Sequence, residues 1–329
     1  MLKFFTLFFF ISLVLFAKDK PILTIYTYDA FGTSWGAGPK IKEVFDKKYD
    51  VTVKFIGLSS SIVALRKIQL EGKKSKADIL MGIDTNIAEV AKKTGLFLPH
   101  GLNTSKLELP FPYKDDIFAA FDYSYVAFVY SEKRVKIPPH SFEELASMPK
   151  EFKIVIQDPR SSTAGLALLL WVKSVYGDKT YEYWKRLAPH ILTITKGWSE
   201  AYGLFLKGEA DMVLSYTTSP AYHIIDENRT DIKAAPFKEG HYGQIEVAGI
   251  LESSKQKDLA KKFLAFMHTK TFADIIPTSN WSYSVVKGSK PLPQAFDTLH
   301  KPKMLLMDGK AVEAQRKAII NEWLRAIQK

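Results

Sequence analysis

The chain has 329 residues, a formal net charge of +11 and no Cys, and 47% of its residues are hydrophobic. This is the composition of an ordinary globular protein, and the length favours two lobes. The lack of Cys excludes disulfide frameworks, thiolate metal sites and Cys nucleophiles, and no block of Lys and Arg indicates that a nucleic acid is a partner.

The first residues have the layout of a secretory signal peptide. Lys3 is followed by an apolar run over residues 4–16, by Ala17, and then by the charged residues 18–20. The run is shorter than the roughly 20 apolar residues that a transmembrane helix needs. We therefore expect residues 1–17 to be removed on export to the periplasm, with cleavage after Ala17 or a residue or two away. The mature protein is then not embedded in the membrane.

The mature part opens with a pattern typical of a parallel βαβ unit. A buried strand is predicted over residues 22–26, and a Gly- and aromatic-rich loop over residues 27–39. The apolar spacing of Ile41, Val44 and Phe45 then predicts a helix, and residues 51–56 predict a second strand. Strand, helix and strand in this order indicate an α/β fold with a parallel sheet.

Two later segments share one pattern, in which an apolar helix ends at a Gly and is followed by Ala-Asp and an apolar strand. In the first segment the helix ends at Gly72, and Ala-Asp and the strand together occupy residues 77–81; in the second, the helix ends at Gly208, and Ala-Asp and the strand occupy residues 210–214. A Gly at each position suits a left-handed helix C-terminus. One such unit in each half, without a Gly/Ser-rich linker, indicates two similar α/β lobes.

Two long strands are predicted over residues 121–130 and 243–250, and a capping box of Ser141 and Glu144 begins the helix after the first. Lobes joined by two long strands have a hinge and are discontinuous in sequence. We expect lobe 1 to comprise residues 18–123 and about 247–284, and lobe 2 to comprise residues 124–246 and about 285–329.

The loops that follow the predicted strands are unusually aromatic, and in open α/β sheets the ligand lies there. The candidate binding residues in these loops are Tyr28, Asp29, Asp84, Trp198, Tyr216, Tyr222 and Trp281. Core aromatics would follow a helix or strand period, whereas these lie among polar residues. Each alone could pack at a surface or hinge, but as a set they favour stacking on a flat or cationic ring. The carboxylates could pair with a cation or act as general acids or bases.

Ser161, Ser162 and Thr163 directly precede an apolar helix. An anion site would form from the free N–H groups of the helix N-terminus, these hydroxyls and Arg160. The alternative is that the hydroxyls serve only to cap the helix. No P-loop lysine is present.

No catalytic or zinc motif stands out, because paired-His spacings and a Gly-x-Ser-x-Gly elbow are both absent. We therefore expect no catalytic residue, no metal site and no cofactor. Tyr216 and Tyr222 with His223 leave ferric iron open as an alternative ligand, although iron-binding relatives present neighbouring tyrosines and five residues intervene here.

In residues 26–29, 158–163, 197–208, 214–223 and 280–281 the chain resembles the bacterial periplasmic thiamine-binding proteins, the substrate-binding components of thiamine ABC importers. The likeness covers nearly the whole chain. It implies a type II periplasmic binding protein fold, with the ligand enclosed between two lobes on a hinge. It also implies that a monomer without enzymatic activity carries thiamine, and its mono- and diphosphate, to a permease with its ATPase.

Carried over residue by residue, the resemblance implies that Trp198, Tyr222 and Trp281 hold the rings of thiamine, with Tyr28 and Tyr216 around them. Asp29 would offset the thiazolium charge or bond the aminopyrimidine. The hydroxyls of residues 161–163 would bind a phosphate.

Residues 285–308 do not follow the family pattern, which leaves the third crossing between the lobes open. Two alternatives remain within the same fold. One is a ferric-ion or small-anion carrier. The other is a thiamine-degrading enzyme, which would need the Cys nucleophile that this chain lacks.

Overall fold

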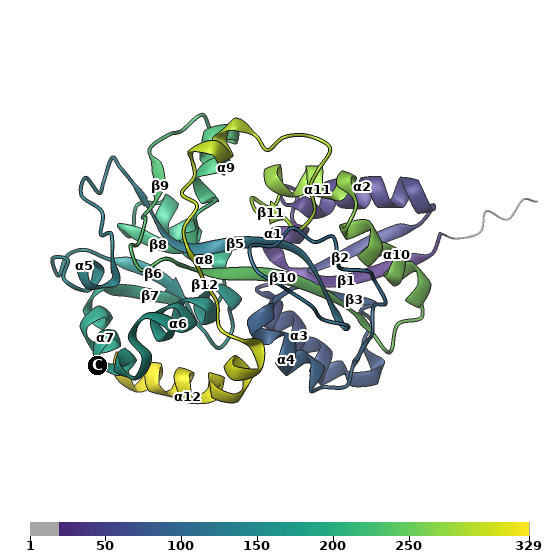
Figure 1. Cartoon of the computed structure of the whole chain (residues 1–329), viewed down its shortest axis with the longest axis horizontal. Helices are drawn as coiled ribbons and strands as arrows, with labels where there is room; N and C mark the ends of the chain where they lie inside the picture. Colours follow the sequence, from purple (N-terminus) through teal and green to yellow (C-terminus); the bar gives the residue numbers. More distant parts are fainter. Residues whose placement is uncertain (1–19, 329) are drawn as a thin grey trace, which may run out of the picture.

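A computed structural model describes residues 20–328, so the predicted signal peptide lies outside the described residues (Figure 1). The strands are β1 Ile22–Tyr28, β2 Thr52–Leu58, β3 Ile79–Asp84, β4 Phe97–Leu98, β5 Phe118–Ser131, β6 Ile154–Gln157, β7 Ile191–Thr195, β8 Met212–Tyr216, β9 Ile232–Ala234, β10 His241–Leu251, β11 Tyr283–Ser284 and β12 Met304–Leu305. The α-helices are α1 Asp29–Gly32, α2 Ala37–Tyr49, α3 Ser61–Glu71, α4 Thr85–Lys92, α5 Phe142–Ala146, α6 Thr163–Tyr176, α7 Thr180–Leu187, α8 Trp198–Leu206, α9 Ser219–Asp226, α10 Lys257–Met267, α11 Lys270–Ile275 and α12 Gly309–Ile327. Short 3-10 turns are η1 Gly72–Lys74, η2 Gly177–Lys179, η3 Ala188–His190, η4 Ile276–Thr278 and η5 Gln294–Thr298.

The strands follow the order β2-β1-β3-β10-β5-β8-β6-β7. β1 pairs in parallel with β2 and β3, and β6 pairs in parallel with β7 and β8. Between these two parallel groups the long strands β5 and β10 run antiparallel to each other and join the lobes. This arrangement confirms the predicted α/β class with two lobes and the predicted βαβ start.

Helices cover both faces of the sheet because the strands are apolar on both sides. In lobe 1, Ile25 of β1 packs with Ile41 and Phe45 of α2 and with Phe263 of α10. In lobe 2, Val155 of β6 and Val213 of β8 pack with Phe205 of α8. The largest core cluster extends across both lobes and lies between the sheet and helices α3, α4, α6 and α12.

Local signals in the sequence set several element ends. Gly72 and Gly208 both have positive φ angles, of 54° and 84°, as the predicted Gly helix ends require. The ψ angle of −132° places Gly72 outside the left-handed helical region, so the prediction of a left-handed helix end is wrong for α3. At α5, the Ser141 hydroxyl accepts the Glu144 N–H at 3.1 Å. The Glu144 carboxylate accepts from the N–H of His140 instead of closing the predicted box on Ser141.

The region predicted as a loop over residues 27–39 is more ordered than expected. The short helix α1 occupies residues 29–32, and α2 already begins at Ala37 rather than near Ile41. The predicted loop extended to Pro39, but proline fits the first turn of a helix, where its missing N–H breaks no intrahelical bond.

The C-terminal part crosses between the lobes. β11 pairs with β5 and β12 pairs with β10, and α12 then lies against α4 of lobe 1 and α7 of lobe 2. The allocation of residues 285–329 to lobe 2, like the other lobe boundaries, stays a prediction. Within the described residues, no helix combines the length and apolarity that a membrane span requires.

Candidate functional site

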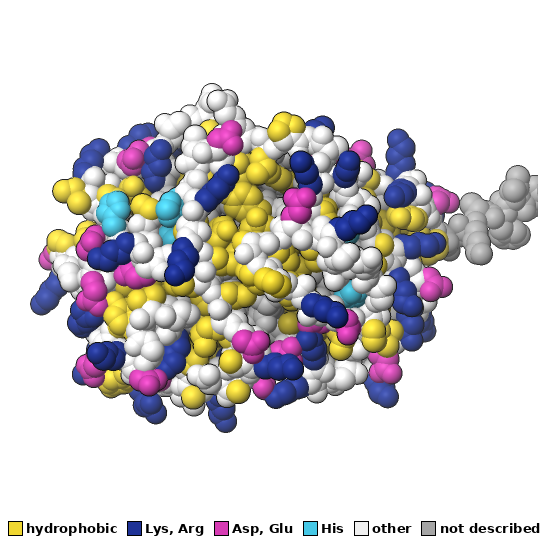
Figure 2. Space-filling model, viewed as in Figure 1, with side chains coloured by type: hydrophobic (Ala, Val, Ile, Leu, Met, Phe, Trp, Pro, Cys, Tyr) yellow, Lys and Arg dark blue, Asp and Glu magenta, His cyan; other side chains and the backbone are white. Residues whose placement is uncertain are grey.

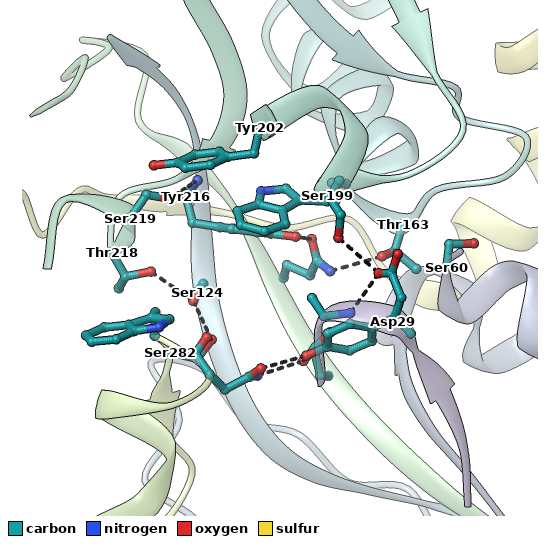
Figure 3. Close-up of a pocket in the computed structure, with 18 of the residues that line it drawn as sticks. Asp29, Ser60, Ser124, Thr163, Ser199, Tyr202, Tyr216, Thr218, Ser219 and Ser282 are labelled. Carbon is teal, nitrogen blue, oxygen red and sulfur yellow. Dashed lines mark hydrogen bonds between the residues drawn. The ribbon is translucent and has the colours of Figure 1, made fainter. Parts of the chain in front are cut away.

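A cavity of about 430 Å³ lies between the lobes, and side chains from both of them line it (Figure 3). On the molecular face shown in Figure 2, Lys and Arg are scattered among Asp and Glu. The cavity differs from that surface. Its lining is mostly aromatic and hydroxyl-bearing, with three carboxyl side chains and, among the described residues that line it, no Lys, Arg or His.

Tyr28 ends β1 and forms the lobe 1 wall of the cavity. Gly82, at φ 91°, gives its ring room, because a Cβ there would lie 2.5 Å from Tyr28 Cε1. The Tyr28 hydroxyl lies 2.9 Å from both Glu246 Oε2 and Asn280 Oδ1. Burial next to Glu246 raises the pKa of Tyr28 well above its ordinary value, so the phenol stays neutral.

Trp198, the first residue of α8, lines the cavity from lobe 2. Its indole stacks on Tyr202 with ring centroids 4.6 Å apart, and its Nε1 donates to the Ser215 hydroxyl at 2.8 Å. The Tyr202 hydroxyl in turn lies 2.8 Å from His223 Nε2, and the His223 ring is fully buried. The indole is therefore held in one orientation before any ligand is present.

Tyr222 of α9 and Trp281 pack edge to face at 5.3 Å between centroids and form another aromatic wall. Trp281 has a φ of 55°, which is uncommon for a bulky residue. Such backbone strain concentrates at binding sites, where surrounding structure enforces it. The strain is consistent with a positioned ligand-facing indole.

Asp29 links the lobes at one side of the cavity. Its Oδ1 accepts the N–H of Ala30 at 2.7 Å and, from lobe 2, the Ser199 hydroxyl at 3.0 Å. A second contact between lobes joins the Ser60 hydroxyl to the carbonyl of Ser161, and a third joins Arg66 Nη2 to the carbonyl of Arg160 at 2.7 Å.

Two helix N-termini meet at the cavity. Ser60 caps α3 and Ser162 caps α6, each through its hydroxyl, and both residues line the cavity. Capping by Ser162 is thus confirmed, and the anion site stays a prediction. Thr163 Oγ1 accepts from Gln244 Nε2 at 3.2 Å, which leaves its own hydrogen free to donate. Two positive helix ends with hydroxyls can bind an anion.

The structure brings most of the sequence-predicted site residues together. The ones that line the cavity are Tyr28, Asp29, Ser162, Thr163, Trp198, Tyr216, Tyr222 and Trp281. Ser161 does not line it, because its side chain donates to the carbonyl of Lys196 at 2.9 Å. Asp84 does not line it either, because its fully buried carboxyl caps α4. The carboxyl accepts from the backbone N–H and from the side-chain Nδ2 of Asn86. Burial raises the pKa of Asp84 to about 7.

Asp122 and Glu246 also line the cavity and were missed, because they lie within strands rather than after them. A signal was available, since each is the one charged residue of its predicted strand. Gln244 was missed for the same reason; its Oε1 accepts the Tyr216 hydroxyl at 3.1 Å.

Among the described residues, no three His, Asp or Glu side chains are arranged to hold a metal ion. Burial beside Glu246 raises the pKa of Tyr216 well above its ordinary value, which opposes formation of the tyrosinate that ferric iron binds.

Comparisons with known proteins point in one direction. Residues 33–273 match the family of bacterial extracellular solute-binding proteins. The thiamine-binding periplasmic protein of Salmonella typhimurium (strain LT2) is 48% identical over 314 residues, which cover 95% of each chain. A solved structure of a periplasmic thiamin binding protein superimposes with a TM-score of 0.91 at 47% identity, covering 94% of this chain and 97% of the other.

A ferric binding protein from Campylobacter jejuni superimposes with a TM-score of 0.74 at 19% identity, covering 92% of this chain and 99% of the other. That likeness concerns the fold alone.

Proposed function

The chain belongs to the bacterial extracellular solute-binding proteins, and from this premise we propose that it binds thiamine between its lobes for uptake by an ABC importer. The resemblance expected from the sequence and its type II binding protein fold are confirmed by relatives of 47–48% identity over nearly the full chain. The observation that carries the proposal is the lining of the cavity, which, over the described part of the chain, combines aromatic walls with carboxyl groups and no basic side chain.

Thiamine has two flat rings, one of which, the thiazolium, carries a permanent positive charge. Aromatic faces attract such a cation by about 0.5–2 kcal/mol each, and Tyr28, Trp198, Tyr222 and Trp281 supply faces from both lobes. The role of each of these residues, and of Asp29 as partner of the thiazolium or the aminopyrimidine, belongs to the proposal.

We further propose a periplasmic monomer that hands thiamine to a permease with its ATPase and does not cleave it. The ligand bridges the lobes and stabilises the closed form that the transporter recognises. Cleavage through a Cys nucleophile has no thiol available in this chain.

The proposal is tested by calorimetric titration of the purified protein, unfolded and refolded beforehand to remove carried ligand. Thiamine should bind saturably at one site, and ferric ion should produce no tyrosinate colour. Absence of thiamine binding, or release of free pyrimidine, would overturn the proposed function.

Thiamine monophosphate and diphosphate are further proposed ligands, with the phosphate at the α3 and α6 N-termini. Thr163→Val is expected to weaken monophosphate binding about tenfold, since a hydrogen bond to a charged group is lost. Thiamine itself should lose much less affinity. Equal losses for both ligands in calorimetric titrations would place the phosphate elsewhere.

A further inference from the structure

The residues that the sequence did not single out include two acids at the cavity, one buried and one half-buried. Asp122 of β5 and Glu246 of β10 are direct cross-strand partners, so their side chains leave the same face of the sheet. Both line the cavity, and Asp122 is fully buried. Oδ1 of Asp122 is buried without any hydrogen-bond partner among the described residues. A buried carboxylate oxygen left without a partner is costly unless a ligand or a proton compensates it.

Hydrogen counting around Asn280 shows that this cluster holds a proton. Asn280 Nδ2 donates to Asp122 Oδ2 at 2.6 Å, so its Oδ1 faces the Tyr28 hydroxyl. That hydroxyl has one hydrogen but also lies 2.9 Å from Glu246 Oε2, and both contacts are satisfied only if Glu246 carries a proton.

The opposite orientation of the Asn280 amide leads to the same count. Its Nδ2 would then donate to Tyr28, and its Oδ1 would lie 2.6 Å from Asp122 Oδ2, which requires a proton on Asp122. In either orientation the two acids together hold at least one proton.

The groups that face the pair from neighbouring elements do not supply a positive charge. They are Tyr28 from β1, Asp84 from β3, Tyr216 from β8 and Asn280 from the loop after η4. Asp84 is the register partner of Glu246 on the other side of β10. Burial, the adjacent Asp122 carboxyl group and, to a smaller extent, Asp84 raise the pKa of Glu246 well above its ordinary value, and burial also raises the pKa of Asp122.

We propose that Asp122 and Glu246 form a cation subsite for the thiazolium ring and that ligand binding expels the proton that they share. The inference rests on the proposed function and specifies which carboxyl groups balance the charge of the ligand. A permanent cation next to the pair favours its fully ionised form, so the proton leaves to solvent. Affinity for thiamine therefore rises with pH, by at most about tenfold per pH unit, until the pair of the free protein is ionised.

The test is calorimetry of thiamine binding at pH 7 in buffers with different ionisation enthalpies. Unphosphorylated thiamine is used so that no phosphate titrates. We expect the wild-type protein to release roughly one proton per thiamine bound. Glu246→Gln and Asp122→Asn should each bind more weakly and release essentially none.

Asp29→Asn is the matched control, because it removes another cavity carboxylate and should weaken binding while proton release persists. The wild-type measurement stands even if a variant fails to fold. Thiamine binding without proton release would overturn this inference and leave the proposed function intact. Release that persists in both Glu246→Gln and Asp122→Asn would also overturn it. Absence of wild-type binding would overturn the proposed function together with the inference.

Discussion

Trp198→Ala is expected to weaken thiamine binding by roughly 100-fold, the loss of about 2.7 kcal/mol. The indole is held in place by stacking on Tyr202 and by its bond to Ser215, so it meets the ligand without an ordering cost. Alanine removes the aromatic face and leaves a void next to Tyr202. Calorimetric titration measures the loss, because a fluorescence titration would lose part of its own signal.

Two further substitutions separate stacking from position. Trp198→Phe keeps an aromatic face but loses the Nε1 bond, and its affinity should fall between wild type and Trp198→Ala. Trp35 lies at the rim of the cavity with 56% of its surface exposed. Trp35→Ala should therefore cost less than about fivefold, since an exposed ring gains little from stacking. Near wild-type binding by a folded Trp198→Ala would exclude Trp198 as a stacking platform.

The fold was predictable from the sequence where the patterns were local. The apolar runs of β1 and β2, the long strands β5 and β10 and the Gly helix ends at Gly72 and Gly208 each have a direct physical cause in the chain. The helix start at Ala37 was not predictable in this way, because proline, here Pro39, occurs both in loops and in the first turn of helices. The course of residues 285–308 depends on pairing with β5 and β10, which no local pattern specifies.

The site was predictable where function lies in loops after strands, as for Tyr28, Trp198 and Trp281. The expectation that binding residues lie in the loops after strands was wrong for Asp122 and Glu246. These acids reach the cavity from within the strands that cross between the lobes. The same expectation also included Asp84, whose position after a strand serves the N-terminus of α4 instead. Sequence position thus identified the cavity but not which carboxyl groups face it.

Gly197→Ala is expected to weaken thiamine binding about 30-fold by keeping the lobes apart. Gly197 caps α8 in an extended conformation that any residue adopts, so lobe 2 itself should fold normally. A Cβ at this position would lie 2.2 Å from the carbonyl oxygen of Ser59, at the start of α3 in lobe 1. The lobes must then separate, which costs the bonds from Ser60 to Ser161 and from Ser199 to Asp29 at about 1 kcal/mol each. The contact of Arg66 with the carbonyl of Arg160 is exposed to solvent and adds little.

Gly32→Ala is the matched control, because a Cβ there meets the Cβ of Phe55 at an ordinary 3.6 Å. It should bind thiamine as the wild type does. Small-angle scattering supplies a second readout, in which thiamine contracts the wild type and Gly32→Ala but not Gly197→Ala. Thermal unfolding without ligand should agree for all three proteins, since the obstruction exists only when the lobes meet. A Gly197→Ala protein that binds and contracts normally would show that ligand capture does not require the approach of Gly197 to Ser59.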